Sequence, residues 1–226
     1  MKSQGPSLHP VTVHDQALAA RCAQGRVIII DDDPEILQAL AALMESAAYA
    51  CETYTSGLTY LQVVNYNRPS FPGPVCLLCD VKMPGLSGLE LCQKLTAHDD
   101  PPLLIMSGSS GIDEAIAAFR GGVLDFFTKP VDADTLLAGI QKALAVSTQR
   151  QQQRQRQQSL ATKVAALTSR ERNIARQVAR GLTNPVIAQK LGIALRTVKL
   201  HRQRAMEKLG VGSLADLVRL ADEGGL

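Results

Sequence analysis

The sequence lacks tryptophan, has few aromatic residues and contains no long apolar run. Aromatic residues make up only 4% of the chain, which argues against a ligand pocket lined by aromatic rings. No apolar run approaches the roughly 18 residues that a membrane-spanning helix needs, so we expect no contact with a membrane. The first 25 residues lack the basic start, apolar centre and small-residue cleavage site of a secretory signal. A cytoplasmic location is therefore the expectation.

Cysteine is also scarce and irregularly spaced. Five cysteines are present, and an odd number without an export signal predicts reduced thiols instead of a disulfide framework. One pair, Cys76 and Cys79, has the CxxC spacing of metal and redox sites, but both could equally be packing residues of a buried strand. Because side chains of a strand alternate between faces, residues three apart point to opposite sides of the sheet. This alternation favours packing over a shared metal.

Each part of the chain is poor in charge of one sign. Residues 1–146 hold nine Lys and Arg against sixteen Asp and Glu, whereas residues 147–226 hold fifteen against five. An acidic first part suits a cation site, and a basic second part is the electrostatic pattern of a nucleic-acid binder. Between them, STQRQQQRQRQQS at residues 147–159 has almost no apolar side chain and cannot build a core. We therefore expect two domains joined by a Gln/Arg-rich linker that is partly helical.

Residues 26–146 show five short apolar runs that alternate with helical patterns. Uniformly apolar strands separated by helices indicate a parallel sheet covered by helices on both faces. The expected fold is therefore α/β, a flavodoxin-like (βα)5 domain, followed by an all-α domain. The expected strands are Val27–Ile30, Ala50–Tyr54, Val75–Cys79, Leu103–Met106 and Val123–Phe126.

Polar side chains stand at the carboxyl ends of four of these strands. Asp31 and Asp32 follow the first strand, Asp80 the third, Ser107 the fourth and Lys129 the fifth. Parallel sheets place their ligand sites at this edge. Crowded carboxylates need a counter-charge, and an oxygen-rich site suits Mg²⁺. A carboxylate beside a metal ion and an ammonium group can attack a phosphoryl group, because both cations neutralise charge on the transferring oxygens.

Four motifs carry a resemblance to a known family, and they occur in the family's order: VIIIDDDP, CDVKMPGLSGLEL, IMSGSS and DFFTKP. Residues 26–146 resemble the receiver domain of bacterial two-component response regulators. The resemblance implies that Asp80 accepts a phosphoryl group from a sensor histidine kinase and that Mg²⁺ is the cofactor.

The same resemblance implies a role for each residue of the edge. Asp31, Asp32, Asp80 and the backbone carbonyl of Lys82 would hold Mg²⁺. Ser107 would supply the switch hydroxyl, Lys129 the site ammonium and Phe126 the aromatic ring whose rotamer reports phosphorylation. In such domains the bond between Lys129 and Pro130 is typically cis. Ser at 107 replaces the commoner Thr and Phe at 126 replaces Tyr, but hydroxyl and ring are retained.

The second domain shows helical patterns throughout. Two of its helices are joined by a tight turn that contains glycine, and the second of them, expected over residues 194–209, is basic. This arrangement predicts a helix-turn-helix whose second helix enters the major groove of DNA. The expected caps and turns are Thr168 or Ser169, Gly181, Asn184 followed by Pro185 at the first helical position, and Gly192.

The order LTSRE, GLTN, IA, LG, RTVK, H, KLG, S, LV resembles the LuxR-type DNA-binding domain. With the receiver, it places the chain in the FixJ/NarL group of response regulators. The resemblance implies a transcription regulator, not an enzyme, that dimerises on phosphorylation and binds double-stranded promoter DNA. The residues expected at the DNA are Lys199, Leu200 and Gln203 facing the bases, and Arg196, Thr197, His201, Arg202 and Arg204 near the backbone. Leu200 is an outward apolar residue among cations, which suits contact with a thymine methyl group.

These patterns predict four segments: an N-terminal extension at residues 1–25, the receiver at 26–146, the linker at 147–163 and the DNA-binding domain at 164–226. A haloacid-dehalogenase-like phosphatase also uses a strand-end aspartate, but it needs a second acid two residues on, where this chain has Lys82. A quorum-sensing LuxR regulator shares the second domain, but its first domain binds an acylated lactone in an aromatic-lined pocket. A receiver that works without phosphate stays an open alternative.

Overall fold

The computed structural model of the chain describes residues 25–66, 73–95, 101–108 and 112–226. It divides into two compact units, with the boundary between Gln151 and Gln152. The predicted N-terminal extension lies outside the described residues, apart from Gly25. Within the described residues, no helix is long and apolar enough to cross a membrane.

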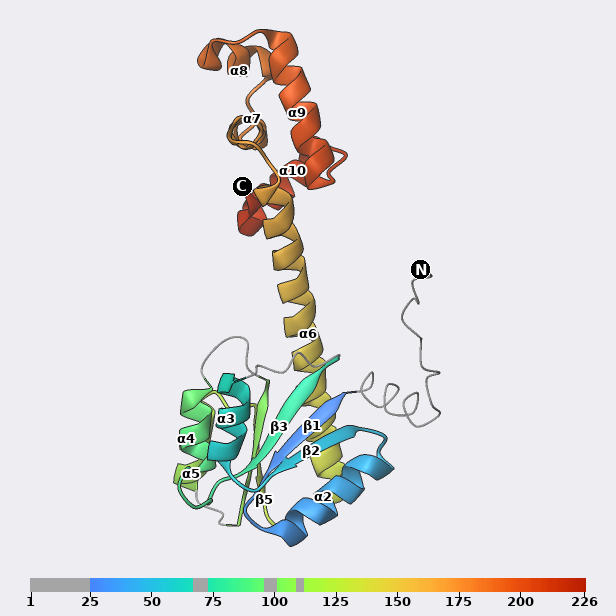
Figure 1. The fold of residues 1–226 in the computed structure, drawn as a ribbon, viewed down its shortest axis with the longest axis vertical. Helices are drawn as coiled ribbons and strands as arrows, with labels where there is room; N and C mark the ends of the chain where they lie inside the picture. The colour runs from blue at the N-terminus through green and yellow to red at the C-terminus, as the bar shows by residue number, and fades with distance from the viewer. Residues whose placement is uncertain (1–24, 67–72, 96–100, 109–111) are drawn as a thin grey trace, which may run out of the picture. The chain divides into compact units, whose positions relative to one another are not determined.

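The first unit is built on a five-stranded sheet (Figure 1). The strand order is β2-β1-β3-β4-β5, and every neighbouring pair is parallel. This confirms the expected α/β class and (βα)5 order. The last strand begins two residues later than predicted, because Val123 lies in the turn before it and its N–H donates to Ala118 of the preceding helix. The strands are β1 Arg26–Ile30, β2 Ala50–Tyr54, β3 Val75–Asp80, β4 Leu103–Ser107 and β5 Asp125–Thr128.

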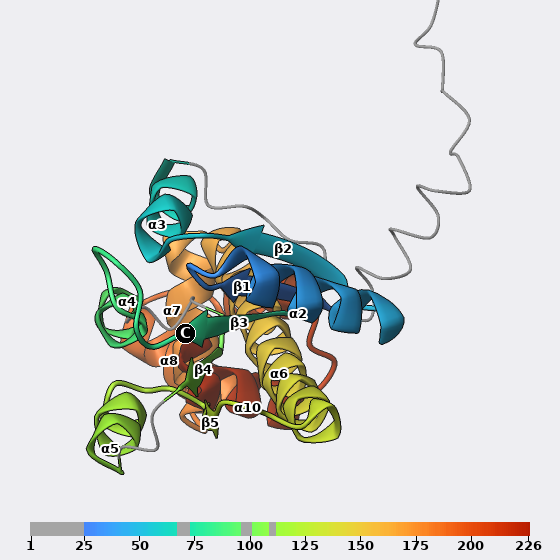
Figure 2. The ribbon, with the colours of Figure 1, turned by 90° about the horizontal axis from the view of Figure 1, so that it is seen from below.

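Helices cover both faces of the sheet (Figure 2). Leu91 of α4 and Ala118 of α5 pack on one face, and Leu37 of α2 and Ile140 of α6 pack on the other. The three central strands are almost wholly buried because both of their faces are covered. The helices of this unit are α2 Pro34–Ser46, α3 Gly57–Tyr66, α4 Gly88–Lys94, α5 Ile112–Arg120 and α6 Ala133–Ala165, which continues past the unit boundary.

Cys76 and Cys79 lie on opposite faces of the sheet. Cys76 packs among the residues under α2 and α6, and Cys79 among those under α3, α4 and α5. Burial raises the pKa of Cys76 to about 12 and also raises the pKa of Cys79. A metal or redox site needs thiolates that converge, so both cysteines are packing residues, as the alternation of strand side chains predicts.

The second unit is helical throughout its described residues. Val198, Ala205 and Leu209 of α9 are buried in its core, together with Ile174 of α7 and Leu217 of α10. Thr168 caps α7 in a capping box with Glu171. The helices are α7 Ser169–Ala179, α8 Asn184–Leu191, α9 Leu195–Leu209, α10 Leu214–Leu220 and a terminal π-helical turn at Ala221–Gly225.

The prediction that Asn184 caps α8 is wrong. Thr183 is the cap residue, and its side chain makes no cap hydrogen bond. Asn184 is the first helical residue, and its side-chain oxygen accepts a hydrogen bond from Arg202 of α9 at 3.2 Å. A contact between the two helices of the helix-turn-helix has therefore replaced the local cap.

Candidate functional site

The carboxyl edge of the sheet brings together polar residues from four strands. Asp31 directly follows β1, Asp80 ends β3, Ser107 ends β4 and Lys129 directly follows β5. Parallel strands end at the same edge, so residues far apart in the sequence become neighbours. Three of these polar residues are buried: Asp31 is 1% exposed, Asp80 7% and Ser107 1%.

Lys129 joins the two buried carboxylates. Its Nζ atom lies 2.8 Å from Oδ2 of Asp31 and 2.5 Å from Oδ1 of Asp80. Burial by itself would lower the pKa of Lys129, but the hydrogen bonds and negative charges of the two carboxylates outweigh it and raise the pKa. Lys129 is therefore a fixed ammonium group that only partly compensates two buried negative charges.

Backbone N–H groups hold the other oxygens of the same carboxylates. The N–H of Lys82 donates to Oδ2 of Asp80 at 2.7 Å, and the N–H of Asp33 donates to Oδ1 of Asp31 at 3.0 Å. The Asp33 side chain caps α2 by accepting hydrogen bonds from the backbone N–H groups of Glu35 and Ile36, so its role is structural. Asp32 is exposed at the edge. Both buried carboxylates are thus held in fixed orientations before any ligand binds.

The donor set of this edge fits Mg²⁺. Among the described residues, no group of three or more His, Cys, Asp or Glu side chains could hold a metal ion unaided. Mg²⁺ does not require such a cage, because it commonly takes one or two carboxylates and keeps several water ligands. Asp31 and Asp80 share one ammonium group, which places their carboxylates close together. A divalent cation would complete the neutralisation that Lys129 begins.

The hydroxyl of Ser107 does not donate to the Asp80 carboxylate. It donates instead to Oε2 of Glu114 in α5 at 3.1 Å, and Oε1 of Glu114 lies 3.5 Å from the ammonium group of Lys82. Sequence reasoning missed Glu114, and its only signal was an acidic residue in the first turn of the helix after Ser107.

Phe126 is half-buried against the cluster under α3, α4 and α5. The bond between Lys129 and Pro130 is cis, as the resemblance implied.

The outer face of α9 carries most of the residues expected at DNA. Arg196, Lys199, Leu200, Gln203 and Arg204 are exposed, and Leu200 is 45% exposed despite its apolar side chain. The other three, Thr197, His201 and Arg202, are half-buried. Most of the predicted set therefore shares one solvent-facing side of a single helix.

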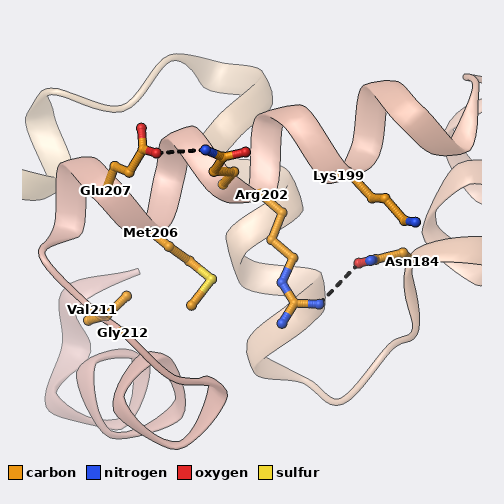
Figure 3. A pocket seen from close by; sticks show the side chains of 8 residues that line it. Asn184, Lys199, Arg202, Met206, Glu207, Val211 and Gly212 are labelled. Atoms are coloured by element: carbon orange, nitrogen blue, oxygen red, sulfur yellow. Dashed lines mark hydrogen bonds between the residues drawn. The ribbon is translucent and has the colours of Figure 1, made fainter.

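An open groove of about 390 Å³ runs beside α9 (Figure 3). The guanidinium group of Arg202 donates to Asn184 across it, so the start of α8 is fixed to α9. Gln203 donates its side-chain amide to Glu207 at 2.9 Å, one turn along the same helix. The lining residues are Asn184, Lys199, Arg202, Gln203, Met206, Glu207, Val211 and Gly212.

Both units match known families. Residues 27–141 match the response regulator receiver domain, and residues 165–221 match the bacterial regulatory proteins of the luxR family. The chain is 33% identical over 206 residues to the transcriptional regulatory protein FixJ of Bradyrhizobium diazoefficiens, covering 90% of this chain and 97% of that protein. This chain belongs to the two-component response regulators of the FixJ/NarL group. As a family, these are DNA-binding transcription regulators.

Other relatives of this response regulator agree in both domains. The response regulator protein TodT of Pseudomonas putida is 34% identical over 197 residues, covering 87% of this chain and 85% of TodT. The solved structure of the response regulator StyR has a TM-score of 0.80 at 36% identity and covers 89% of this chain and all of that one. Full-length FixJ from B. japonicum has a TM-score of 0.53 at 33% identity and covers 90% of this chain and 98% of that one.

Proposed function

We propose that this response regulator accepts a phosphoryl group on Asp80 from a sensor histidine kinase, and that phosphorylation leads to dimerisation and promoter binding. The observation that carries the proposal is the pair of bonds from Lys129 to Asp80 and Asp31. A carboxylate that is buried, oriented by a backbone N–H and paired with a fixed ammonium group is prepared for phosphoryl transfer.

In the proposed reaction a carboxylate oxygen of Asp80 attacks the phosphorus of a phosphohistidine. A P–O bond forms as the P–N bond breaks, and the histidine nitrogen keeps the electron pair. Lys129 holds positive charge where negative charge develops on the transferring oxygens. Asp31, Asp32, Asp80 and the carbonyl of Lys82 would hold Mg²⁺, which when bound neutralises further charge on these oxygens.

The response to phosphorylation is proposed to pass through Ser107 and Phe126. Both would turn toward the phosphorylated site and change the face formed by α5, β5 and the first turns of α6. To convert a protein that is mostly inactive into one that is mostly active, phosphorylation must favour the active state by about 5.5 kcal/mol. A dimer interface on this face would supply part of that difference.

Dimerisation supports promoter binding through effective concentration. Two DNA-binding domains in one dimer can occupy two half-sites together, so affinity increases without a new base contact. We propose that Lys199, Leu200 and Gln203 face the bases and that Arg196, Thr197, His201, Arg202 and Arg204 lie near the backbone. The exposed basic side of α9 supports this assignment.

Labelling with acetyl phosphate and Mg²⁺, followed by peptide mass spectrometry, tests the phospho-acceptor. The wild type is expected to gain one phosphoryl group on Asp80, Asp80→Asn none, and removal of Mg²⁺ with EDTA should abolish labelling. Asp33→Asn is a matched control, because asparagine caps helices as well as aspartate does, and it should label normally. Label on Asp80→Asn, or none on the wild type, would refute the assignment.

A further inference from the structure

Glu114 connects the end of β4 with the loop that follows β3. Its carboxylate accepts the Ser107 hydroxyl with one oxygen at 3.1 Å and lies 3.5 Å from the Lys82 ammonium group with the other. Ser107 is buried, and the Glu114 side chain is only 29% exposed. A hydrogen bond to a charged acceptor in such partial burial is stronger than one between neutral groups.

The bond from Ser107 to Glu114 competes with the proposed switch. A serine hydroxyl has one proton to donate, so Ser107 cannot donate to Glu114 and to a phosphoryl group on Asp80 at the same time. We propose that Glu114 is a latch: a positioning residue that holds the Ser107 hydroxyl on α5 until phosphorylation of Asp80 displaces it. The release step rests on the proposed function of Asp80, whereas the hydrogen bond itself does not.

Electrostatics favours release once the phosphoryl group is present. An aspartyl phosphate carries up to about −2 at neutral pH, where the Asp80 carboxylate that it replaces carried about −1, so negative charge increases at the site. The backbone N–H of Lys82 already donates to Asp80, so the residue that pairs with Glu114 also borders the phosphorylation site. The phosphoryl group would therefore repel Glu114 and compete with it for Ser107 and Lys82. Loss of the latch frees α5 to move. This helix follows Ser107 in the chain and is part of the proposed switch face.

Hydrogen exchange of the unphosphorylated full-length protein tests the latch without any phosphate donor. Glu114→Ala should increase the exchange rate of the α5 amides about fivefold. Loss of a single charged hydrogen bond shifts the local opening equilibrium that controls exchange by about tenfold or less. Alanine is the best helix former, so a lower intrinsic helix propensity cannot explain faster exchange. Arg120→Ala removes an exposed charged side chain from the same helix and should leave the rate nearly unchanged.

A double-mutant cycle separates a latch from a merely structural role. In a Ser107→Ala background, Glu114→Ala should no longer change the exchange of α5, whereas in a Ser107→Thr background, which keeps the hydroxyl, it should act as in the wild type. Equal effects in the wild-type and Ser107→Ala backgrounds, or no effect in either, would overturn the latch.

The initial rate of labelling by acetyl phosphate tests the release step. Glu114→Ala should be labelled about fivefold faster than the wild type, because the latch no longer opposes the active state. An unchanged rate in a protein that does take up label would refute release by phosphorylation while leaving the phospho-acceptor intact. Absence of label on the wild type would instead refute the role of Asp80 and with it the release step, and the exchange experiment would still decide the hydrogen bond.

Discussion

The hydroxyl oxygen of Ser147 accepts a hydrogen bond from the backbone N–H of Val75 at 3.0 Å, and both groups are buried. Ser147 lies in α6, and Val75 begins β3, the strand that ends in Asp80. One turn further along α6, the Gln151 amide donates to the carbonyl of Gly73 at 2.7 Å. Two side chains of the predicted linker therefore attach α6 to the start of the central strand.

Ser147→Ala should destabilise the first unit by about 1–3 kcal/mol, because it leaves the buried N–H of Val75 without an acceptor. All four tyrosines lie in this unit, at residues 49, 54, 60 and 66, so urea unfolding followed by tyrosine fluorescence reports on it alone. Thr148→Ala is the matched control, because its hydroxyl donates to the Leu144 carbonyl of its own helix. Equal losses from both variants would contradict a special role for Ser147.

Glu171 should make the second unit sensitive to acid. A hydrogen bond from Lys208 at 2.7 Å, with further bonds from Thr168, lowers the pKa of Glu171 to about 2. A carboxylate whose pKa is lower when folded stabilises the protein above its unfolded pKa, and the stabilisation is lost as the pH falls toward the folded value. The contribution should therefore be complete above about pH 5 and decline between about pH 5 and 2.

Glu171→Gln should lower the urea midpoint of the second unit at pH 7 and flatten its dependence on pH below 5. Far-UV circular dichroism reports on the unfolding of both units. Tyrosine fluorescence identifies the transition of the first unit, which can then be subtracted from the circular dichroism curve. Glu207→Gln is a suitable control, because the Glu207 carboxylate is exposed and accepts a hydrogen bond from the Gln203 amide of its own helix. A midpoint of Glu171→Gln that follows the wild type across this pH range would show that the contact with Lys208 is without energetic effect.

Lys199→Ala should weaken binding to a DNA duplex selected from random sequences by about 1–3 kcal/mol, the range for loss of a base contact. Phosphorylation of Asp80 should be unaffected, because Lys199 belongs to the other unit. Lys142→Ala removes the same charge from the receiver, where Lys142 pairs with Asp125 at 3.3 Å, and should bind DNA normally. Fluorescence anisotropy measures the affinity of each variant for the duplex. Equal affinities would show that α9 is not part of the DNA interface.

Much of the fold could be predicted from local patterns. The buried runs at Val27–Ile30 and Val75–Cys79 are apolar because helices cover both faces of the sheet, and that requirement is visible residue by residue. The acidic and basic residues of the proposed site could also be found, because parallel strands bring their carboxyl ends to one edge in any such sheet. The exposed side of α9 follows in the same way from helical periodicity.

Contacts between side chains of different elements could not be predicted. The Asn184 side chain could either cap α8 or accept a hydrogen bond from Arg202 of α9. The local sequence pattern favours the cap, but the structure shows the bond to Arg202. Glu114 reaches Ser107 only because α5 starts beside the end of β4. No periodicity in the sequence encodes where either side chain finds its partner.

By itself, the sequence determined the two domains' fold classes, the residues at the strand ends and the polar side of α9, because burial and backbone periodicity act over a few neighbouring residues. Only the tertiary structure decided which partners the polar groups take: Lys129 with Asp31 and Asp80, Ser107 with Glu114, and Ser147 with Val75. A hydrogen bond depends on distances of a few tenths of an ångström between atoms on separate elements, and those distances exist only once the elements have packed.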